Sequence, residues 1–180
     1  MSFVEKYGLR NFKICDVHFH MRYPEKIEDS YEMLKQEMEY FDLDGVQLCS
    51  MPYYDISENY KAFYLKSRLE NVYVGAALTH YQDERDTADG YLAQIKAAHQ
   101  MGCDGIKMLE GKMVVHNMLK GKLSDGLFEK FFAYAEENQL PIVLHVGDPY
   151  FFWDINELRK YSIYEWAMKH NWLLTESPSA

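Results

Sequence analysis

The chain has few of the features that mark secreted, membrane or nucleic-acid-binding proteins. Its three cysteines are odd in number and too widely spaced for a disulfide framework or a zinc knuckle, so a reducing, cytoplasmic setting is expected. No signal-peptide core and no apolar run near the roughly 18 residues of a membrane span occur. Positive charge is also scarce, because 19 Lys and Arg stand against 28 Asp and Glu. The net charge of −9 disfavours nucleic acid and anionic membranes as partners.

Glycine-rich phosphate loops are missing too. Neither GxGxxG nor GxxxxGK[ST] occurs, so nucleotide binding loses its usual sequence support. Apolar material is abundant: 48% of the 180 residues are hydrophobic, enough for one folded domain over residues 1–180.

Short apolar runs alternate with stretches of helical spacing. The runs predict five strands, at 14–20, 45–50, 72–78, 103–109 and 141–146. The stretches between them predict four helices, at 28–41, 57–69, 88–101 and 125–138. This alternation is typical of βα units, and the nearly continuous apolar strands indicate a parallel sheet covered on both faces. The expected class is α/β.

Two architectures use such units, an open doubly wound sheet and a (β/α)8 barrel of the TIM type. The length of 180 residues favours the open sheet, since a barrel typically needs about 250 residues. However, Ser177 and Pro178 give a helix-start signal just where the sequence stops. We therefore expect an incomplete barrel of about five units, truncated at its C-terminus, with the open sheet as the alternative.

The histidines carry the chemistry. His18 and His20 lie two apart at the end of the first strand, so strand alternation points both imidazoles to one side. His145 occupies the corresponding end of the fifth strand. Imidazole suits zinc and other first-row metals, and ligand sites form at the carboxyl ends of parallel strands. Strands one and five face each other across the mouth of a closed barrel but lie far apart in a flat sheet, so a shared metal site favours the barrel.

At these motifs the chain resembles the amidohydrolase superfamily, specifically the amidohydrolase-related group of metal-dependent barrel enzymes that also contains nonoxidative decarboxylases. The resemblance rests on DVHFH, DGIKMLEGK and PIVLHVGDP, which lie within residues 16–148. It implies that His18, His20 and His145 bind a divalent ion, zinc above all. The family pattern continues with a histidine on strand six and an aspartate on strand eight. Neither has a counterpart here, and His170, in a helical stretch at 163–170, is a poor stand-in.

Four more residues are candidates for the same site. Asp16 should face inward one step below His18, where a carboxylate could fix the imidazole tautomer. Lys107 could be a carboxylated metal bridge, a substrate-anion clamp or a lysine that snorkels to solvent, and the last two are favoured. Glu110 could be acid, base or extra ligand, or an exposed loop carboxylate. Asp148 could orient water at the metal, or simply begin a turn with the next proline.

The loop at 111–124 is unusually basic and contains His116. It could close over an anionic substrate, although a solvated loop is the favoured alternative. His80 and His99 have no partners at ligand spacing and are assigned to structure or solvent.

The expected function is metal-dependent hydrolysis, in which metal-activated water attacks an amide, ester or lactone carbonyl of a small-molecule substrate. The first alternative is nonoxidative decarboxylation of an aromatic or unsaturated acid on the same site. The second is a non-catalytic α/β binding module. An incomplete barrel would expose apolar surface, so self-association of two copies is also expected.

Overall fold

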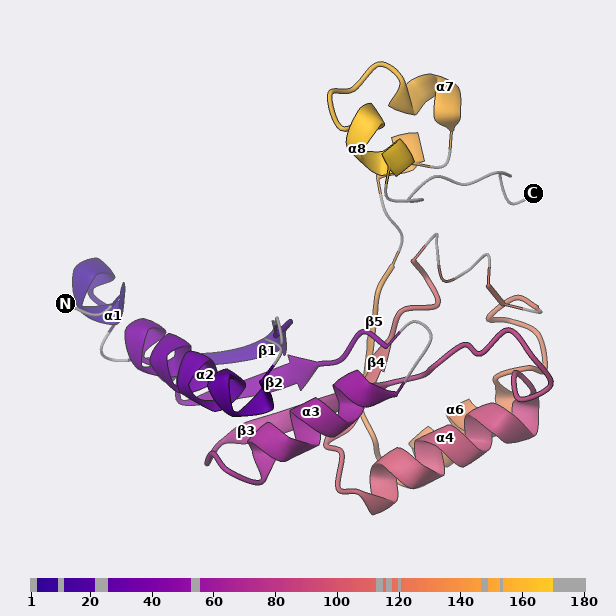
Figure 1. Cartoon of the computed structure of the whole chain (residues 1–180). Coiled ribbons are helices and arrows are strands. Elements are labelled where there is room, and N and C mark those ends of the chain that lie inside the picture. Colours follow the sequence, from indigo (N-terminus) through magenta and orange to yellow (C-terminus); the bar gives the residue numbers. More distant parts are fainter. Residues whose placement is uncertain are drawn as a thin grey trace.

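A computed structural model describes residues 3–9, 12–21, 26–52, 56–112, 115, 118–119, 121–146, 149–152 and 154–169, without the side chains of Phe3 and Phe152. Its centre is a five-stranded, all-parallel sheet with the strand order β1-β2-β3-β4-β5 (Figure 1). The strands are β1 (Cys15–Phe19), β2 (Gly45–Cys49), β3 (Val72–Ala77), β4 (Gly105–Met108) and β5 (Ile142–Leu144). The predicted α/β class and all five predicted strands are confirmed.

The helices fall between the strands as the periodicity predicts. The four expected helices are α2 (Ile27–Phe41), α3 (Ser57–Lys66), α4 (Ala88–Gln100) and α6 (Glu129–Glu137). The last begins four residues later than predicted, after Phe128. Short elements complete the chain: α1 (Phe3–Tyr7), the 3-10 turn η1 (Tyr150–Phe152), α7 (Ile155–Leu158) and α8 (Tyr164–Lys169), of which only α8 lies in a stretch marked as helical from sequence.

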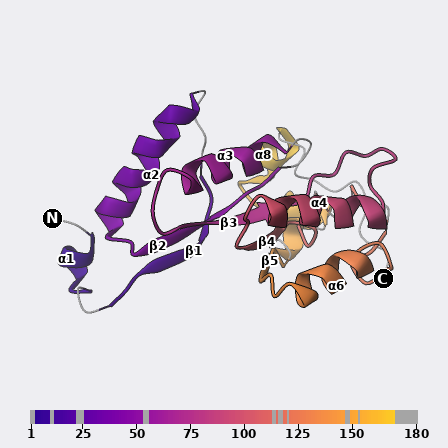
Figure 2. The same ribbon diagram turned by 90° about the horizontal axis from the view of Figure 1, so that it is seen from below.

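The strand order decides between the two architectures. Each strand pairs with its predecessor in sequence, whereas a doubly wound sheet reverses its order at a switch point. The open doubly wound alternative is therefore wrong, and the sheet is a curled half-barrel. Figures 1 and 2 show α2, α3, α4 and α6 along one face of the sheet only, so the expected cover on both faces is wrong as well. The other face carries the polar side chains of the site described below.

The core lies between that helical layer and the three central strands. Strands β2 and β4 are almost entirely buried, and their helix-facing residues Leu48, Ile106 and Met108 pack with Phe128 and Phe131. The outer strands β1 and β5 are mostly exposed or partly exposed, because each has only one neighbour. The half-barrel thus has a closed centre and two open edges.

The segment after β5 stands apart. In Figure 1, α7 and α8 lie on the other side of the sheet from α4 and α6. They are held by their own contacts: Leu158 and Ala167 are fully buried, and the rings of Phe151 and Tyr161 stack with centroids 4.2 Å apart. None of the helices in the described ranges has the length and apolar character needed to cross a bilayer.

Candidate functional site

The carboxyl end of β1 brings two histidines together. The Nε2 atoms of His18 and His20 lie 3.0 Å apart, and the rings meet edge to face with centroids 4.7 Å apart. Both side chains are exposed because β1 is an edge strand. The predicted convergence of the first-strand pair is therefore present, and it opens to solvent.

A backbone carbonyl fixes the tautomer of one of these rings. Nδ1 of His20 lies 2.8 Å from the carbonyl oxygen of Cys49, at the end of β2. A carbonyl oxygen can only accept, so Nδ1 carries the proton and donates it. In neutral His20 the lone pair is then on Nε2, which faces His18. A hydrogen bond that commits one ring nitrogen and leaves the other free is the usual support of a metal-binding histidine.

Lys107 reaches the same point from β4. Its Nζ lies 2.7 Å from Nε2 of His18, and its side chain has no exposed surface. The snorkelling interpretation is therefore wrong, because the amine ends against a histidine rather than in water. Burial lowers the pKa of Lys107 from its usual range, with the charges of Cys49 and Glu110 acting in the opposite direction.

Nε2 of His18 has two nitrogen neighbours, Nε2 of His20 at 3.0 Å and Nζ of Lys107 at 2.7 Å. Burial lowers the pKa of His18, and the charge of Lys107 lowers it further, so the ring is neutral at pH 7. A neutral imidazole carries one lone pair on an unprotonated ring nitrogen, so Nε2 of His18 either accepts from Lys107 or carries a proton and donates it to Nε2 of His20. A cation in place of the Lys107 amine would meet the lone pairs of both rings, and imidazole nitrogens are ligands that zinc prefers. The donor set of β1 therefore fits the implied metal.

His145 lies near this pair without joining it closely. It follows β5, its backbone N–H donates to the carbonyl of Met108 at 2.9 Å, and its charge contributes to lowering the pKa of His18. Within the described ranges, no three or more His, Cys, Asp or Glu side chains gather tightly enough to hold an ion. The structure thus brings together two of the three predicted ligands and Lys107.

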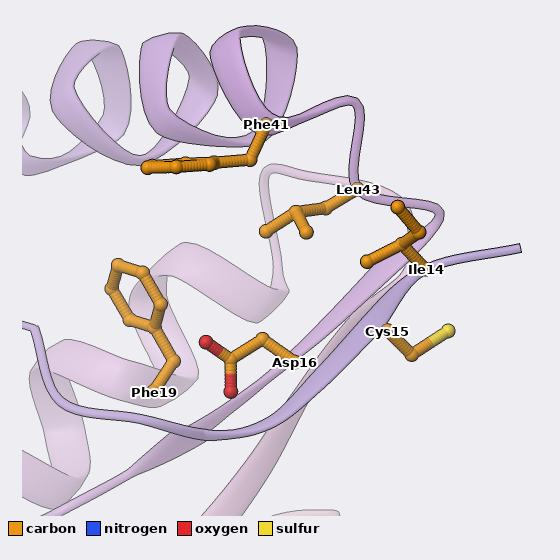
Figure 3. A pocket seen from close by; sticks show the side chains of 6 residues that line it. All are labelled: Ile14, Cys15, Asp16, Phe19, Phe41 and Leu43. Atoms are coloured by element: carbon orange, nitrogen blue, oxygen red, sulfur yellow. The ribbon is translucent and has the colours of Figure 1, made fainter. Parts of the chain in front are cut away.

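Asp16 does not face inward as expected. Asp16 pairs with Val46 and Phe19 pairs with Leu48, so β1 uses one residue more than β2 over the same distance. Val46 and Leu48 both belong to the core, and this bulge turns Asp16 and Phe19 to the same helix-facing side. There Asp16 lines a pocket of about 380 Å³ between β1 and the end of α2, whose other walls are Ile14, Cys15, Phe19, Phe41 and Leu43 (Figure 3).

The contact that Asp16 makes with His18 is to the backbone. Its Oδ1 accepts the N–H of His18 at 2.8 Å, inside the bulge. The carboxylate therefore supports the irregular turn of the strand from which His18 projects. It also opposes, by its charge, the lowering of the His18 pKa. Both effects act on the predicted ligand, although not through the imidazole contact expected from sequence.

Glu110 lies in a different environment from the one expected. Its side chain is fully buried, and Oε1 accepts from Nε2 of His80 at 2.9 Å. Among the described residues its other oxygen, Oε2, has no hydrogen-bond partner. The exposed-carboxylate interpretation is wrong, and so is solvent as the place of His80. Asp148 and His116, the remaining candidates, lie outside the described residues, as does His170.

Sequence reasoning missed the pairing of His80 with Glu110. Ala77 of β3 pairs with Lys107 of β4, and both His80 and Glu110 stand three residues further on. The available signal was therefore positional: two ionisable residues at equal distances beyond neighbouring strands.

Fold and site together define the chain as a parallel α/β half-barrel with a histidine pair at the carboxyl end of its first strand. Comparison with known proteins adds no identity to this class, since no family model matches the chain and no curated protein does so either.

Proposed function

We propose that the chain supplies the first five βα units of a (β/α)8 barrel of the amidohydrolase type and forms part of a metal-dependent hydrolase site. The observation that carries the proposal is the contact between Nε2 of His18 and Nε2 of His20, with Nδ1 of His20 committed to a carbonyl. In the tautomer in which both Nε2 atoms are unprotonated, the two rings aim two neutral nitrogen donors at one point, as a metal-binding pair does. A divalent cation held by both rings would take the place of the Lys107 amine at Nε2 of His18.

In this proposal each residue has a stated task. His18 and His20 hold the ion, and His145 approaches it from β5 as the third ligand. Asp16 holds the bulge that aims His18. A bound divalent ion, zinc in the first instance, acidifies water and polarises the carbonyl of an amide, ester or lactone. Lys107 is shielded from solvent, and its amine contacts Nε2 of His18, the atom that would bind the ion. Metal binding therefore requires the amine to give up this contact, and Lys107 acts on the ligand rather than on a substrate directly.

Metal content tests the proposal most directly. We expect protein purified without chelator to contain about one divalent ion per chain by mass spectrometry, the stoichiometry of a mononuclear site. His18→Ala and His145→Ala should both lose the ion. His99→Ala is the matched control, because His99 is a partly buried histidine on α4 whose ring contacts the hydroxyl of Tyr134 at 2.9 Å, far from β1 in sequence.

Each outcome discriminates between the candidate functions. Loss of metal in both site variants, with the His99 variant unchanged, supports the shared ion and directs substrate assays to carbonyl hydrolysis, with release of CO2 from aromatic acids assayed in parallel. Absence of stoichiometric metal from the unaltered chain, including after incubation with zinc, would sink the proposal and leave the non-catalytic binding module.

A further inference from the structure

Three buried side chains, Glu110, His80 and Tyr91, are linked by hydrogen bonds beyond the ends of β3 and β4. Glu110, fully enclosed, has a single side-chain hydrogen bond within the described part of the protein, the one from His80. The hydroxyl of Tyr91 lies 2.9 Å from the other ring nitrogen of His80. Burial and the charges of Asp86 and Glu110 raise the pKa of Tyr91, so its hydroxyl stays protonated and can donate to Nδ1, while Nε2–H donates to Glu110.

Side chains of α3 and α4 fix the backbone segment that leads from β3 to His80. Its neighbour Thr79 is clamped by Gln94 of α4, whose side-chain amide accepts from the Thr79 N–H at 2.8 Å and donates to the Thr79 carbonyl at 2.9 Å. Asn59 of α3 grips Ala77 in the same two-point manner, at 3.0 and 2.8 Å. Three side chains from two helices therefore fix the backbone and the ring at the end of β3. Glu110 therefore accepts its hydrogen bond from a histidine whose position is already fixed.

The residue after Glu110 touches the backbone of a predicted metal ligand. A Cβ placed on Gly111 would lie 1.9 Å from the carbonyl oxygen of His145 and 3.6 Å from Cα of Val146. Only glycine allows this approach, because the obstacle is backbone and cannot rotate away. The amide of His145 is held by the Met108 carbonyl, two residues before Glu110. The end of β5 is thus seated on the segment that Glu110 anchors.

We propose that Glu110 is a positioning residue for His145: its contact with His80 fixes Gly111, and Gly111 sets where the backbone of His145 lies opposite His18 and His20. The inference rests on the proposed function for the role of His145 as a metal ligand. It assigns to a fully enclosed carboxylate a task that requires no contact with substrate. It also explains why an ionisable pair is buried beyond the ends of β3 and β4, where an apolar pair could fill the space but could not set the position of the loop.

Cobalt binding to the full chain tests the proposal. We titrate Co²⁺ alone and record both its affinity and its ligand-field spectrum, which reports the ligand set rather than activity. Glu110→Ala and Gly111→Ala are each expected to weaken Co²⁺ about 10- to 100-fold, the usual effect of outer-shell changes, and to alter the spectrum. Glu110→Gln should restore binding, since its amide oxygen can still accept from His80. Gly126→Ala is the matched control, because a Cβ there meets only an atom 3.9 Å away.

A double-mutant cycle separates positioning from general destabilisation. At Co²⁺ concentrations high enough to load the weakened site that His18 and His20 retain in His145→Ala, the additional Glu110→Ala change should weaken Co²⁺ no further, because the residue through which Glu110 acts is gone. A full additional loss would show a merely structural role and overturn the inference. Equal Co²⁺ affinity in the unaltered chain and in Gly111→Ala would overturn it too.

Hydrogen exchange of the His145 amide provides a readout that needs no metal. Its exchange should accelerate at least tenfold in Glu110→Ala and Gly111→Ala and return to normal in Glu110→Gln. The amide of Ser50, bonded to the Gly75 carbonyl at 3.1 Å, serves as the internal reference. If the unaltered chain binds no Co²⁺, the proposed function fails while the exchange data still decide the positioning role. Unchanged exchange of His145 in both variants would overturn that role.

Discussion

His20 and His80 both follow strands of the sheet, but the ring of His20 is exposed to solvent and the ring of His80 is buried. His20 follows β1, contacts a carbonyl and another imidazole, and is exposed. His80 lies beyond β3, contacts a hydroxyl and a carboxylate, and is 1% exposed. In neutral His20 the lone pair lies on Nε2, which faces only another imidazole. In His80, both ring nitrogens have a hydrogen-bond partner.

The difference follows from the position of the strands in the sheet. A central strand has neighbours on both sides and helices over it, so polar groups at its end are enclosed and must be paired. An edge strand leaves its terminal side chains in contact with solvent, where an unsatisfied nitrogen costs little and can accept a ligand. The half-barrel therefore separates an enclosed frame, at β3 and β4, from a solvent-exposed edge, at β1.

Alanine at each of the two histidines tests this separation and should give the largest difference. His80→Ala leaves the Glu110 carboxylate buried without its partner, and we expect the free energy of unfolding to fall by about 3–5 kcal/mol. His20→Ala removes contacts that water can replace, and the loss should stay under about 1 kcal/mol. Urea unfolding at pH 7, followed by circular dichroism, measures both.

A second substitution keeps the first result interpretable. The double variant with His80→Leu and Glu110→Leu removes both polar groups, and its stability should recover much of the loss. Equal losses for His20→Ala and His80→Ala would remove the distinction between frame and edge.

Much of the fold could be predicted because the relevant signals are local. Apolar runs located all five strands, and helical spacing over 125–138 located α6. Local signals do not give the order of the strands in the sheet, and only the strand pairings exclude the open doubly wound alternative. The start of α6 is predicted too early: helical spacing extends back to residue 125, whereas the helix begins after Phe128, without a side-chain cap.

The site was less predictable because it depends on non-local geometry. The alternation rule placed His18 and His20 correctly on one side, yet the same rule failed for Asp16, since a single extra residue in β1 inverts the face. The contact between His18 and Lys107 joins residues 89 apart in sequence. The pairing of His80 with Glu110 requires the register of β3 on β4 and a hydroxyl from α4. No local pattern encodes either contact.

Two cysteines near strand starts, Cys15 at β1 and Cys103 at β4, show the same difference between the exposed edge and the enclosed frame. Cys15 on β1 is exposed, whereas Cys103, just before β4, is buried, and burial followed by the charge of Asp104 raises its pKa to about 11. Unfolded Cys103 ionises near its ordinary value of 9.0, so between these pH values only the unfolded state releases the proton. The unfolding free energy should therefore fall with rising pH, by about 1.4 kcal/mol per unit, and level off above the folded pKa.

Cys103→Ala provides the reference for this effect. The difference between its stability and that of the unaltered chain should be constant below pH 9 and shrink above it. At pH 8, Ellman's reagent should modify Cys15 rapidly and Cys103 only on unfolding. Rapid modification of every thiol in the folded chain would contradict the closed state of the central strands.

Lys107 connects the enclosed frame to the exposed edge. Its replacement should have the smallest effect on stability, and this effect should be a gain rather than a loss. Its side chain projects from the central strand β4 and is fully buried, while its amine contacts Nε2 of the exposed His18. Burial of the amine opposes its charged form, so Lys107→Met should raise the unfolding free energy by about 1 kcal/mol at pH 7. Lys66→Met is the matched control and should lower it, because Lys66 neutralises Asp104 at 2.6 Å. A gain in stability together with altered metal affinity would show that Lys107 is retained for the site at a cost to the fold. A loss of stability in both variants would instead make Lys107 an ordinary part of the frame.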